Sequence, residues 1–260
     1  MSWKLPTAYQ HLAGPGSLMV EPGGFALPHR LFSLLGVIPR RPRLLDVGAD
    51  HGLLALAALR LGLAEEVLAI DRREGPLAGA AARNFLREGE PFAFKLSDGL
   101  DAVDATEDDC VVIAGMSGEN AASVMKSALT RGKMPALWCF QVNDGHVALR
   151  QTCYASGFRP LTEWFVAEPK RFFLNQIWMY CGSSEFSPSS IDLELGPLSY
   201  SGFSPLMEAW IAVERTRVTR DLEGLRKARG FDERAADFLH LSSRLKLLER
   251  QSLVIPGHTD

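Results

Sequence analysis

Short apolar runs and segments of helical period alternate along the sequence between Arg43 and Gly182. The apolar runs predict buried strands over 43–48, 66–71, 91–96, 110–116 and 136–142. The segments between and after them predict helices over 51–62, 76–88, 119–130 and 146–157. Repeated strand–helix units need crossover connections, so this pattern indicates an open, mostly parallel, doubly wound α/β sheet.

Two further extended runs, 158–167 and 172–181, are joined by the turn 168–171, which is short enough for an antiparallel pair. With the five parallel strands they predict a Rossmann-like, mostly parallel seven-stranded sheet. Ligands of such sheets bind at the carboxyl ends of the strands. The residues that directly follow each strand are therefore the candidates for a functional site.

The segments on either side of this sheet have a different character. Residues 1–27 are expected to be an irregular N-terminal arm, because the first 24 residues are rich in Gly and Pro and show no clear period. After the α/β domain predicted over 28–182, which carries the candidate cofactor site, a polar linker begins at Ser183. Apolar residues at helical spacing over 205–230 and from 231 onward predict a coiled-coil-like helical hairpin within 183–260 that turns near Gly230.

Composition narrows the class of protein. The chain is 47% hydrophobic and 23% charged, as in soluble globular proteins, and it has no apolar run long enough to span a bilayer. The N-terminus does not resemble a secretion signal, and none of the four cysteines forms a C-x-x-C pair, so we expect reduced thiols in a cytoplasmic protein. The six scattered histidines show no metal-ligand spacing at the strand ends, so we expect no metal.

Charge gives only a weak indication of partners. The net charge of −3 is no strong footprint for nucleic acid, although residues 1–43 hold five basic residues against Glu21 alone. The predicted hairpin from Met207 to Arg250 carries ten Lys/Arg and eight Asp/Glu, a net charge of +2. The oligomeric state is not defined by any of these features.

The first strand ends in a glycine-rich turn, Asp46-Val-Gly-Ala-Asp-His-Gly52. A dinucleotide-binding turn needs glycines at its first, third and sixth positions, but Asp50 and Leu53 occupy the third and sixth. An aspartate there would also repel a pyrophosphate. The turn suits a cofactor without phosphate that carries sulfonium and ammonium charges, S-adenosyl-L-methionine; the alternative is a purely structural strand-to-helix turn.

Acidic residues also follow the next two strands. Asp71 could accept the ribose hydroxyls of an adenosine, and Asp98 with Gly99 could receive the adenine amino group. Each could instead be a helix cap or a plain turn, but three acidic strand ends in succession favour a cofactor site. The expected cofactor-binding set is Asp46, Gly48, Asp50, His51, Asp71, Arg72, Asp98, Gly99, Ala114, Gly115 and Met116.

The fourth and fifth strands complete the expected site. The fourth ends in small residues that leave room for a substrate, in place of the Asn-Pro-Pro-aromatic motif of many amino-methylating enzymes. Gln141 and Asn143 end the fifth strand with amide groups, although Asn143 could instead cap the following helix.

These motifs together resemble the bacterial TrmK family of tRNA (adenine-22 N1)-methyltransferases. The matching pieces occur in order: 46–51, Gly75-Pro76 with Ala80 and Asn84, 97–100, 113–118, 140–143, Leu149-Arg150, Glu168 and 196–198. The likeness covers roughly residues 28–250. Ser117 replaces a glycine of the family pattern, Val142 a proline, and Asp71 a more usual glutamate.

The resemblance implies an S-adenosylmethionine-dependent enzyme that methylates adenine N1 in tRNA. It implies that Asp50 is the catalytic carboxylate near the adenine N6, and Asn143 could hydrogen-bond the base edge. The hairpin would then either hold the tRNA through contacts with its phosphates, or only pack on the domain with its charged face in solvent. The alternatives are a methyltransferase of small molecules or proteins, a non-catalytic binding protein on the same fold, and a nicotinamide oxidoreductase, which Asp50 disfavours.

Overall fold

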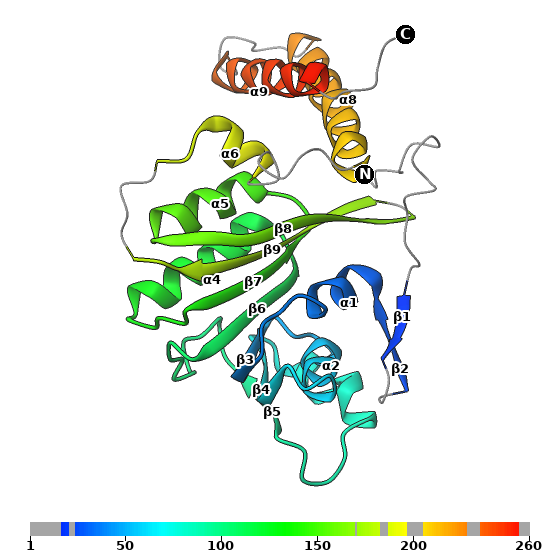
Figure 1. Cartoon of the computed structure of the whole chain (residues 1–260), viewed down its shortest axis with the longest axis vertical. Helices are drawn as coiled ribbons and strands as arrows, with labels where there is room; N and C mark the ends of the chain where they lie inside the picture. The colour runs from blue at the N-terminus through cyan, green and yellow to red at the C-terminus, as the bar shows by residue number, and fades with distance from the viewer. Residues whose placement is uncertain are drawn as a thin grey trace.

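The computed structural model describes residues 17–20, 24–169, 171–182, 187–196, 205–227 and 235–254. Its centre is a seven-stranded sheet with the order β5-β4-β3-β6-β7-β9-β8 (Figure 1). The strands are β3 (Arg41–Val47), β4 (Ala64–Asp71), β5 (Phe92–Leu96), β6 (Asp109–Met116), β7 (Leu137–Val142), β8 (Phe158–Glu168) and β9 (Arg171–Tyr180). Strands β3 to β7 pair in parallel, and β9 is antiparallel to both of its neighbours, which confirms the predicted fold class.

Helices cover both faces of the sheet and create two apolar cores. Helices α1 (His29–Leu35) and α2 (Leu53–Arg60) lie on one face, and α4 (Gly118–Thr130) and α5 (His146–Ala155) lie on the other (Figure 1). Neighbouring strand residues alternate between the cores: Leu44 belongs to the α1–α2 core and Leu45 to the α4–α5 core. Burial on both faces explains why the central strands have continuous apolar sequences.

The predicted helix over 76–88 is wrong in extent. The structure has only the short helix α3 (Glu74–Ala78) and the 3-10 turn η2 (Ala81–Asn84) there. Gly75, Pro76 and Gly79 lie in or beside α3. Glycine is a poor helix former and proline is tolerated only in a first turn, so the apolar period does not extend into a longer helix.

The N-terminal arm is not irregular throughout. Strands β1 (Ser17–Val20) and β2 (Phe25–Pro28) form an antiparallel pair, with the Gly24 N–H donating to the Val20 carbonyl. Val20, Phe25 and Leu27 are buried against the core that contains α1 and α2. Tertiary packing thus orders a segment whose sequence lacks a clear period; residues 1–16 and 21–23 lie outside the described residues.

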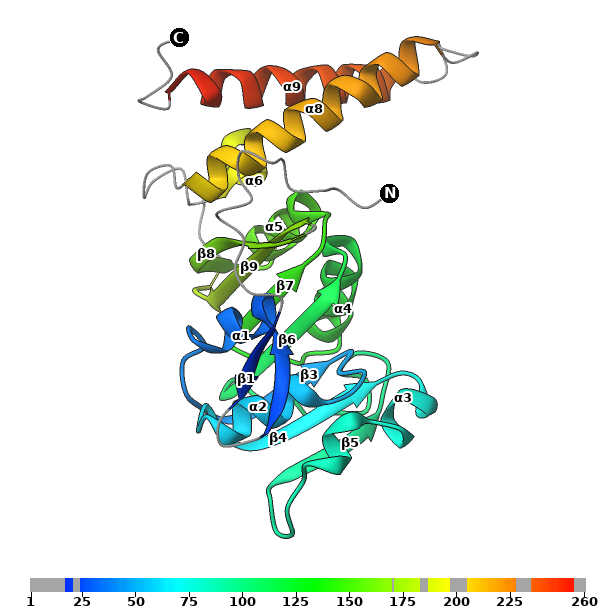
Figure 2. The ribbon, with the colours of Figure 1, turned by 90° about the vertical axis from the view of Figure 1, so that its right-hand side faces the viewer.

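In the described part of the chain after the sheet, the structure has the helices α6 (Ser190–Leu195), α8 (Pro205–Lys227) and α9 (Ala235–Val254). Helices α8 and α9 pack against each other and run in roughly opposite directions above the sheet domain (Figure 2), as expected of a hairpin. The expected turn at Gly230 lies outside the described residues. Trp210 of α8 stacks on Phe165 of β8, with ring centroids 4.9 Å apart, so the hairpin shares a core with the sheet domain.

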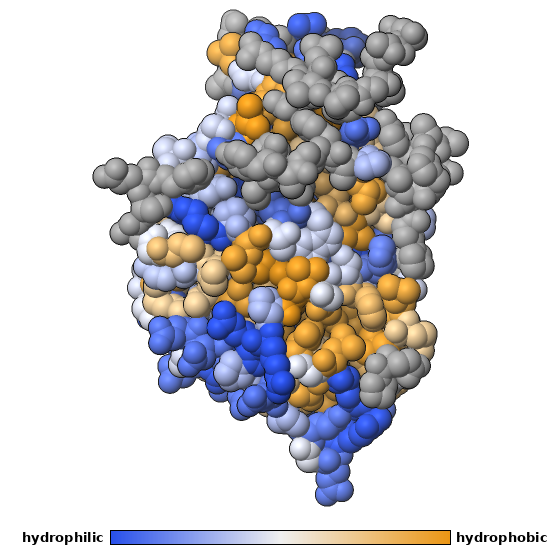
Figure 3. Space-filling model, viewed as in Figure 1, coloured by the Kyte–Doolittle hydropathy of each residue, from blue (hydrophilic) through white to orange (hydrophobic). Residues whose placement is uncertain are grey.

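The described residues also bear on membrane-spanning helices, metal ligands and cysteines. None of the described helices has the length and apolar character needed to cross a membrane. Within the described residues, no group of three or more potential metal ligands gathers. All four cysteines are free, and Cys110, Cys139 and Cys153 are buried. Apolar side chains gather on the molecular face that carries α1 and α2 (Figure 3).

Candidate functional site

A cavity of about 940 Å³ opens at the carboxyl ends of β3, β4 and β6 and at the turn that follows β5. Chain order along the sheet reverses between β3 and β6, which is where open α/β sheets bind ligands. All eleven residues expected to bind a cofactor line this cavity. Residues distant in sequence therefore meet at one place because parallel strands present their carboxyl ends on the same edge.

The turn after β3 brings backbone close to the cavity. Gly48 has φ of +77°, and a Cβ atom there would lie 2.1 Å from the Met116 Cε. Asp50 also has a positive φ, +48°, which is uncommon for a residue with a side chain and is often found at functional sites. The Asp50 side chain is exposed, with its Oδ2 3.6 Å from the His51 Nε2.

Asp46, at the end of β3, is a buried carboxylate facing this cavity. Its Oδ2 is buried without a hydrogen-bond partner. Burial is the largest influence on its pKa, followed by a hydrogen bond from the Ala55 backbone that opposes it and by the nearby charge of Asp71; together they raise the pKa to about 7. A cationic ligand group would supply the missing partner.

Asp71 and Asp98 differ in their surroundings. Asp71 is buried, and its Oδ1 accepts a hydrogen bond from the Arg73 backbone N–H at 2.9 Å. Its Oδ2 lies 3.4 Å from the Asp50 backbone N–H. A carboxylate has about four acceptor positions, so Asp71 retains capacity toward ligand hydroxyls. Asp98 is exposed at the cavity edge.

Strand β2 and helix α1 supply cavity residues that the sequence did not indicate. Leu27 and Pro28 of β2 and Arg30 and Leu31 of α1 also line the cavity. Arg30 pairs with Glu168 of β8, with its Nη1 3.2 Å from the Glu168 Oε2. The Arg30 Nε also donates to the Gln141 Oε1 at 3.1 Å. The excess of basic residues in 1–43 was the only sequence signal for this contribution, and it did not single out Arg30.

Asn143 borders a different cavity. It lines a second hollow of about 430 Å³ rather than the one with the expected cofactor residues. Its Nδ2 donates to the Gly115 carbonyl at 2.7 Å, and its Oδ1 accepts from the Gln141 Nε2 at 3.4 Å. The two residues expected to be catalytic, Asp50 and Asn143, therefore do not line one cavity.

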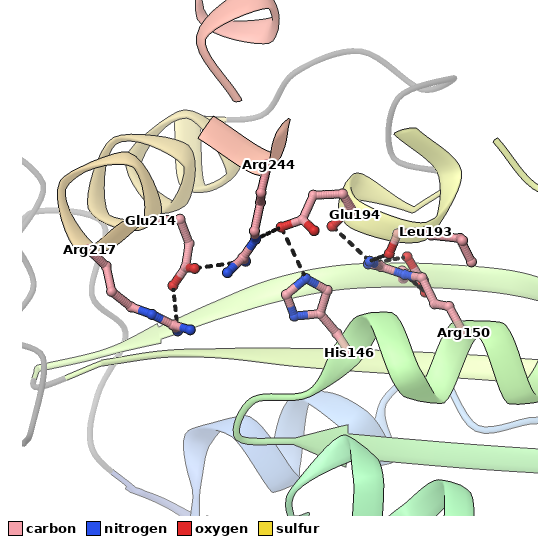
Figure 4. Close-up of polar contacts among 8 residues, drawn as sticks. His146, Arg150, Leu193, Glu194, Glu214, Arg217 and Arg244 are labelled. Carbon is pink, nitrogen blue, oxygen red and sulfur yellow. Dashed lines mark hydrogen bonds and ion pairs between the residues drawn. The ribbon is translucent and has the colours of Figure 1, made fainter. Parts of the chain in front are cut away.

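The second cavity lies where the sheet domain meets the C-terminal helices. Phe165, Trp210, Arg171 and His240 are among its lining residues. An ionic network borders it (Figure 4): the Arg244 Nε lies 2.6 Å from the Glu194 Oε1, and the Arg244 Nη2 lies 2.9 Å from the Glu214 Oε2. His146, at the first position of α5, lies 3.8 Å from Glu194.

The charge of Glu194 is stabilised by its neighbours. Burial by itself would raise its pKa, but the nearby His146 and the charge and hydrogen bond of Arg244 outweigh burial and lower the pKa to about 2. Beside this network, Arg150 is fully buried against Glu163 and donates to the backbone carbonyls of Leu193 and Glu194. Polar contacts thus join α5, α6, α8 and α9.

Solved structures with this fold are similar over nearly their whole length. The Bacillus subtilis m1A22 tRNA methyltransferase TrmK has a TM-score of 0.74 and 21% identity, covering 87% of this chain and 98% of its own. TrmK of M. capricolum, solved with S-adenosyl-homocysteine, has a TM-score of 0.74 and 18% identity, covering 88% and 99%. Streptococcus pneumoniae Sp1610, solved with S-adenosyl-L-methionine, has a TM-score of 0.72 and 23% identity, covering 87% and 99%.

These identities show a shared fold. No curated protein sequence matches the chain. A family model described as a methyltransferase domain matches residues 27–174, which is more than half of the sequence and includes every residue lining the larger cavity. The chain therefore belongs to the methyltransferase domain family.

Proposed function

We propose that this protein uses S-adenosyl-L-methionine to methylate N1 of an adenine in tRNA, at position 22. The observation that carries the proposal is the cavity at the sheet switch point, to which the ends of four strands, β3 to β6, deliver acidic or glycine residues suited to that cofactor. The solved structures of similar fold that carry this cofactor or its product support the same choice.

The residues present fit the cofactor. The unpartnered, buried Asp46 Oδ2 suits a cationic group such as an ammonium. Asp71 and Asp98 both line the cavity; Asp71 would accept hydrogen bonds from ribose hydroxyls, and Asp98 would accept one from an adenine amino group. When bound, the cofactor supplies an electrophilic methyl group. The chain's role is to hold it and to exclude water around it.

Methylation of adenine N1 mainly requires the enzyme to position the acceptor base. Adenine N1 carries a lone pair and needs no strong base, so the enzyme must bring it in line with the methyl group at about 3 to 3.5 Å. Attack places positive charge on the adenine, and the exposed Asp50 carboxylate at the cavity edge would stabilise that charge or take a proton from N6. Because N1 lies on the Watson–Crick edge, a paired adenine must first be exposed.

The tRNA substrate is proposed from two observations. The Bacillus subtilis protein of the same fold is described as a tRNA methyltransferase. The hairpin over Met207–Arg250 carries a small positive net charge, which allows phosphate contacts beside the cavities.

The first test is a transfer assay. The purified chain is incubated with methyl-labelled cofactor and either an unmodified tRNA transcript with A22 or the same transcript with G22. Labelled 1-methyladenosine in the first alone is the expected result. Label in neither transcript, although the cofactor still binds, would discard tRNA as the substrate.

The second test addresses Asp50. We expect Asp50→Ala to retain cofactor affinity within about threefold and to lose about 10²-fold in kcat, the low end for a positioned acid–base group. Glu65→Ala, which removes an exposed carboxylate of β4 that lines neither cavity, serves as the comparison. An Asp50→Ala enzyme with undiminished kcat would exclude the proposed role.

A further inference from the structure

We propose that Arg30 and Gln141 form a positioning pair that fixes the peptide of Gly115 beside the reacting groups. This inference rests on the proposed function, since it names further residues needed for the same reaction. It also assigns Asn143 to this positioning chain.

Gln141 is the centre of the arrangement. Its side chain is fully buried at the end of β7. Its Oε1 accepts from the Gly115 N–H at 3.1 Å and from the Arg30 Nε at 3.1 Å. Its Nε2 donates to the Asn143 Oδ1 at 3.4 Å, and Asn143 returns a hydrogen bond to the Gly115 carbonyl at 2.7 Å. Both polar groups of Gly115 are therefore held by side chains that end β7.

The donors decide how the two amides point. A guanidinium can only donate, and so can a backbone N–H, so both require the oxygen of Gln141 to face them. The Gln141 Nε2 must then face Asn143, which directs the Asn143 Nδ2 toward the Gly115 carbonyl. Reversing the Gln141 amide would set two donors against its nitrogen inside a buried site, where each unmade hydrogen bond is costly.

Arg30 is itself fixed rather than available as an anion site. The Glu168 carboxylate accepts hydrogen bonds from the Arg30 Nη1 at 3.2 and 3.3 Å and from the Arg30 backbone N–H at 3.1 Å. The Asn175 Nδ2 donates to the Arg30 carbonyl at 2.9 Å. The guanidinium also lies 4.7 Å from the centre of the Phe173 ring. With its charge balanced by Glu168, Arg30 serves as a rigid donor toward Gln141.

Gly115 is a position that needs such support. It has φ of +81°, and the pairing of β6 with β7 is irregular between Ala114 and Met116. Regular strand pairing does not hold this peptide, although it borders the cavity. Met116 follows directly and lies against Gly48. A displacement of about 1 Å at reacting groups can lower a rate about 10²-fold, so this peptide's position matters to the transfer step.

The effect should appear in kcat more than in cofactor affinity. The residues proposed to hold the cofactor's charged and polar groups are Asp46, Asp71 and Asp98, which end β3 and β4 or follow β5. Gly115, although among the residues expected to line the cofactor site, has no side chain with which to hold the cofactor, and it stands near the end of β6, where small residues are expected to leave room for the acceptor. Loosening its peptide would disturb the alignment of acceptor and methyl group while leaving the cofactor's anchors in place.

The experiment is a double-mutant cycle with Arg30→Met, Gln141→Met and the double variant. We measure kcat for tRNA methylation and the Kd of S-adenosylhomocysteine. The matched control is Arg60→Met, which breaks the ion pair between Arg60 of α2 and Glu90. Their Nε and Oε1 atoms lie 2.6 Å apart, and neither residue lines the cavity. We expect each single variant to lose at least tenfold in kcat and less than threefold in affinity. The double variant should lose no more kcat than the worse single variant. Arg60→Met should keep the kcat of the wild type.

Unchanged kcat in both single variants would overturn the inference, as would fully multiplicative losses in the double variant. If the wild-type protein methylates no tRNA, the proposed function fails, and the pair is then judged by hydrogen exchange of the Gly115 amide. Loss of its protection in Arg30→Met and Gln141→Met, but not in Arg60→Met, would support the pair; retained protection would refute it.

Discussion

At the residue scale, the buried Asp46 is expected to lower the stability of the ligand-free protein near neutral pH while it contributes to cofactor binding. Its pKa is about 7 in the folded chain against about 3.8 when unfolded, so the folded state holds a proton that the unfolded state releases between these values. Stability without ligand should therefore fall as pH rises from about 4 to 7. We expect urea unfolding to show this decline in the wild type and a shallower one in Asp46→Asn, which should also lose at least tenfold in cofactor affinity. Parallel pH profiles of the two proteins would contradict the assignment.

Substitution of Gly48 by alanine is expected to have two effects, backbone strain and a clash with Met116, which a control at Gly62 distinguishes. Gly48→Ala places a Cβ in a left-handed backbone and against Met116, which must move into the cavity. Gly62→Ala is the matched control, because Gly62 has φ of +69° but open space around its would-be Cβ. Both should lose about 1 kcal/mol from backbone strain. Only Gly48→Ala should also weaken cofactor binding, by about tenfold or more in calorimetry; equal affinities would show that Met116 yields without consequence.

Residues at strand ends were the predictable part of the site. Asp46, Asp71 and Asp98 meet because parallel topology gathers the carboxyl ends of strands, and topology follows from the apolar pattern. Arg30 was not predictable in this way. Its partner Glu168 is 138 positions away, and only the packing of α1 beside β8 and β9 brings them together.

At the scale of elements, α4 and α5 begin unusually close together. The Gly118 N–H donates to the Asp144 carbonyl at 2.8 Å, and a Cβ on Gly118 would lie 2.1 Å from the Gly145 carbonyl oxygen. Gly118→Ala should therefore cost about 1–3 kcal/mol of unfolding free energy, as overpacking does. Gly224→Ala, in α8 with open space around it, should instead gain about 0.5–1 kcal/mol. Chemical denaturation of both variants checks these opposite signs, and a neutral Gly118→Ala would mean that the helix starts can separate.

Strands with continuous apolar sequences were predicted well, and very short elements were not. Strand β7 is buried at all six positions, as its continuous apolar sequence predicts. Helix α6 was assigned to a linker, although Ser189 and Asp192 form a capping box that is readable in the sequence. The pair β1 and β2 has four residues per strand, too few to display a period, and the sheet domain orders it by packing.

At the scale of the whole molecule, the C-terminal helices are joined to the sheet domain by both apolar and ionic contacts. Trp210 reaches the sheet core, while Glu194 and Arg244 join α6 to α9. His146 connects this network to the start of α5, three residues after Asn143. The position of the hairpin is thereby tied to the strand ends that form the site.

Arg244 should be the polar residue on which hairpin docking depends most. Its side chain is 12% exposed and it contacts two carboxylates that are each 10% exposed, so Arg244→Met would remove the shared cation between two nearly buried carboxylates. We expect a loss of about 3 kcal/mol at pH 7. Arg217→Met is the control: that guanidinium is 34% exposed and pairs with Glu214 at 3.3 Å, so its loss should cost under about 1 kcal/mol.

The pH dependence of the same network has a defined sign. Because the pKa of Glu194 is about 2 when folded and about 4.5 when unfolded, its pairing contributes fully above pH 4.5 and is lost as pH falls toward 2. The stability gap between the wild type and Glu194→Gln, measured by denaturation, should narrow across this window. Arg244 and His146 contact the Glu194 carboxylate, and the Arg150 guanidinium lies beside the Glu194 backbone. A gap that stays constant down to pH 2 would mean that Glu194 does not hold α9 through its charge.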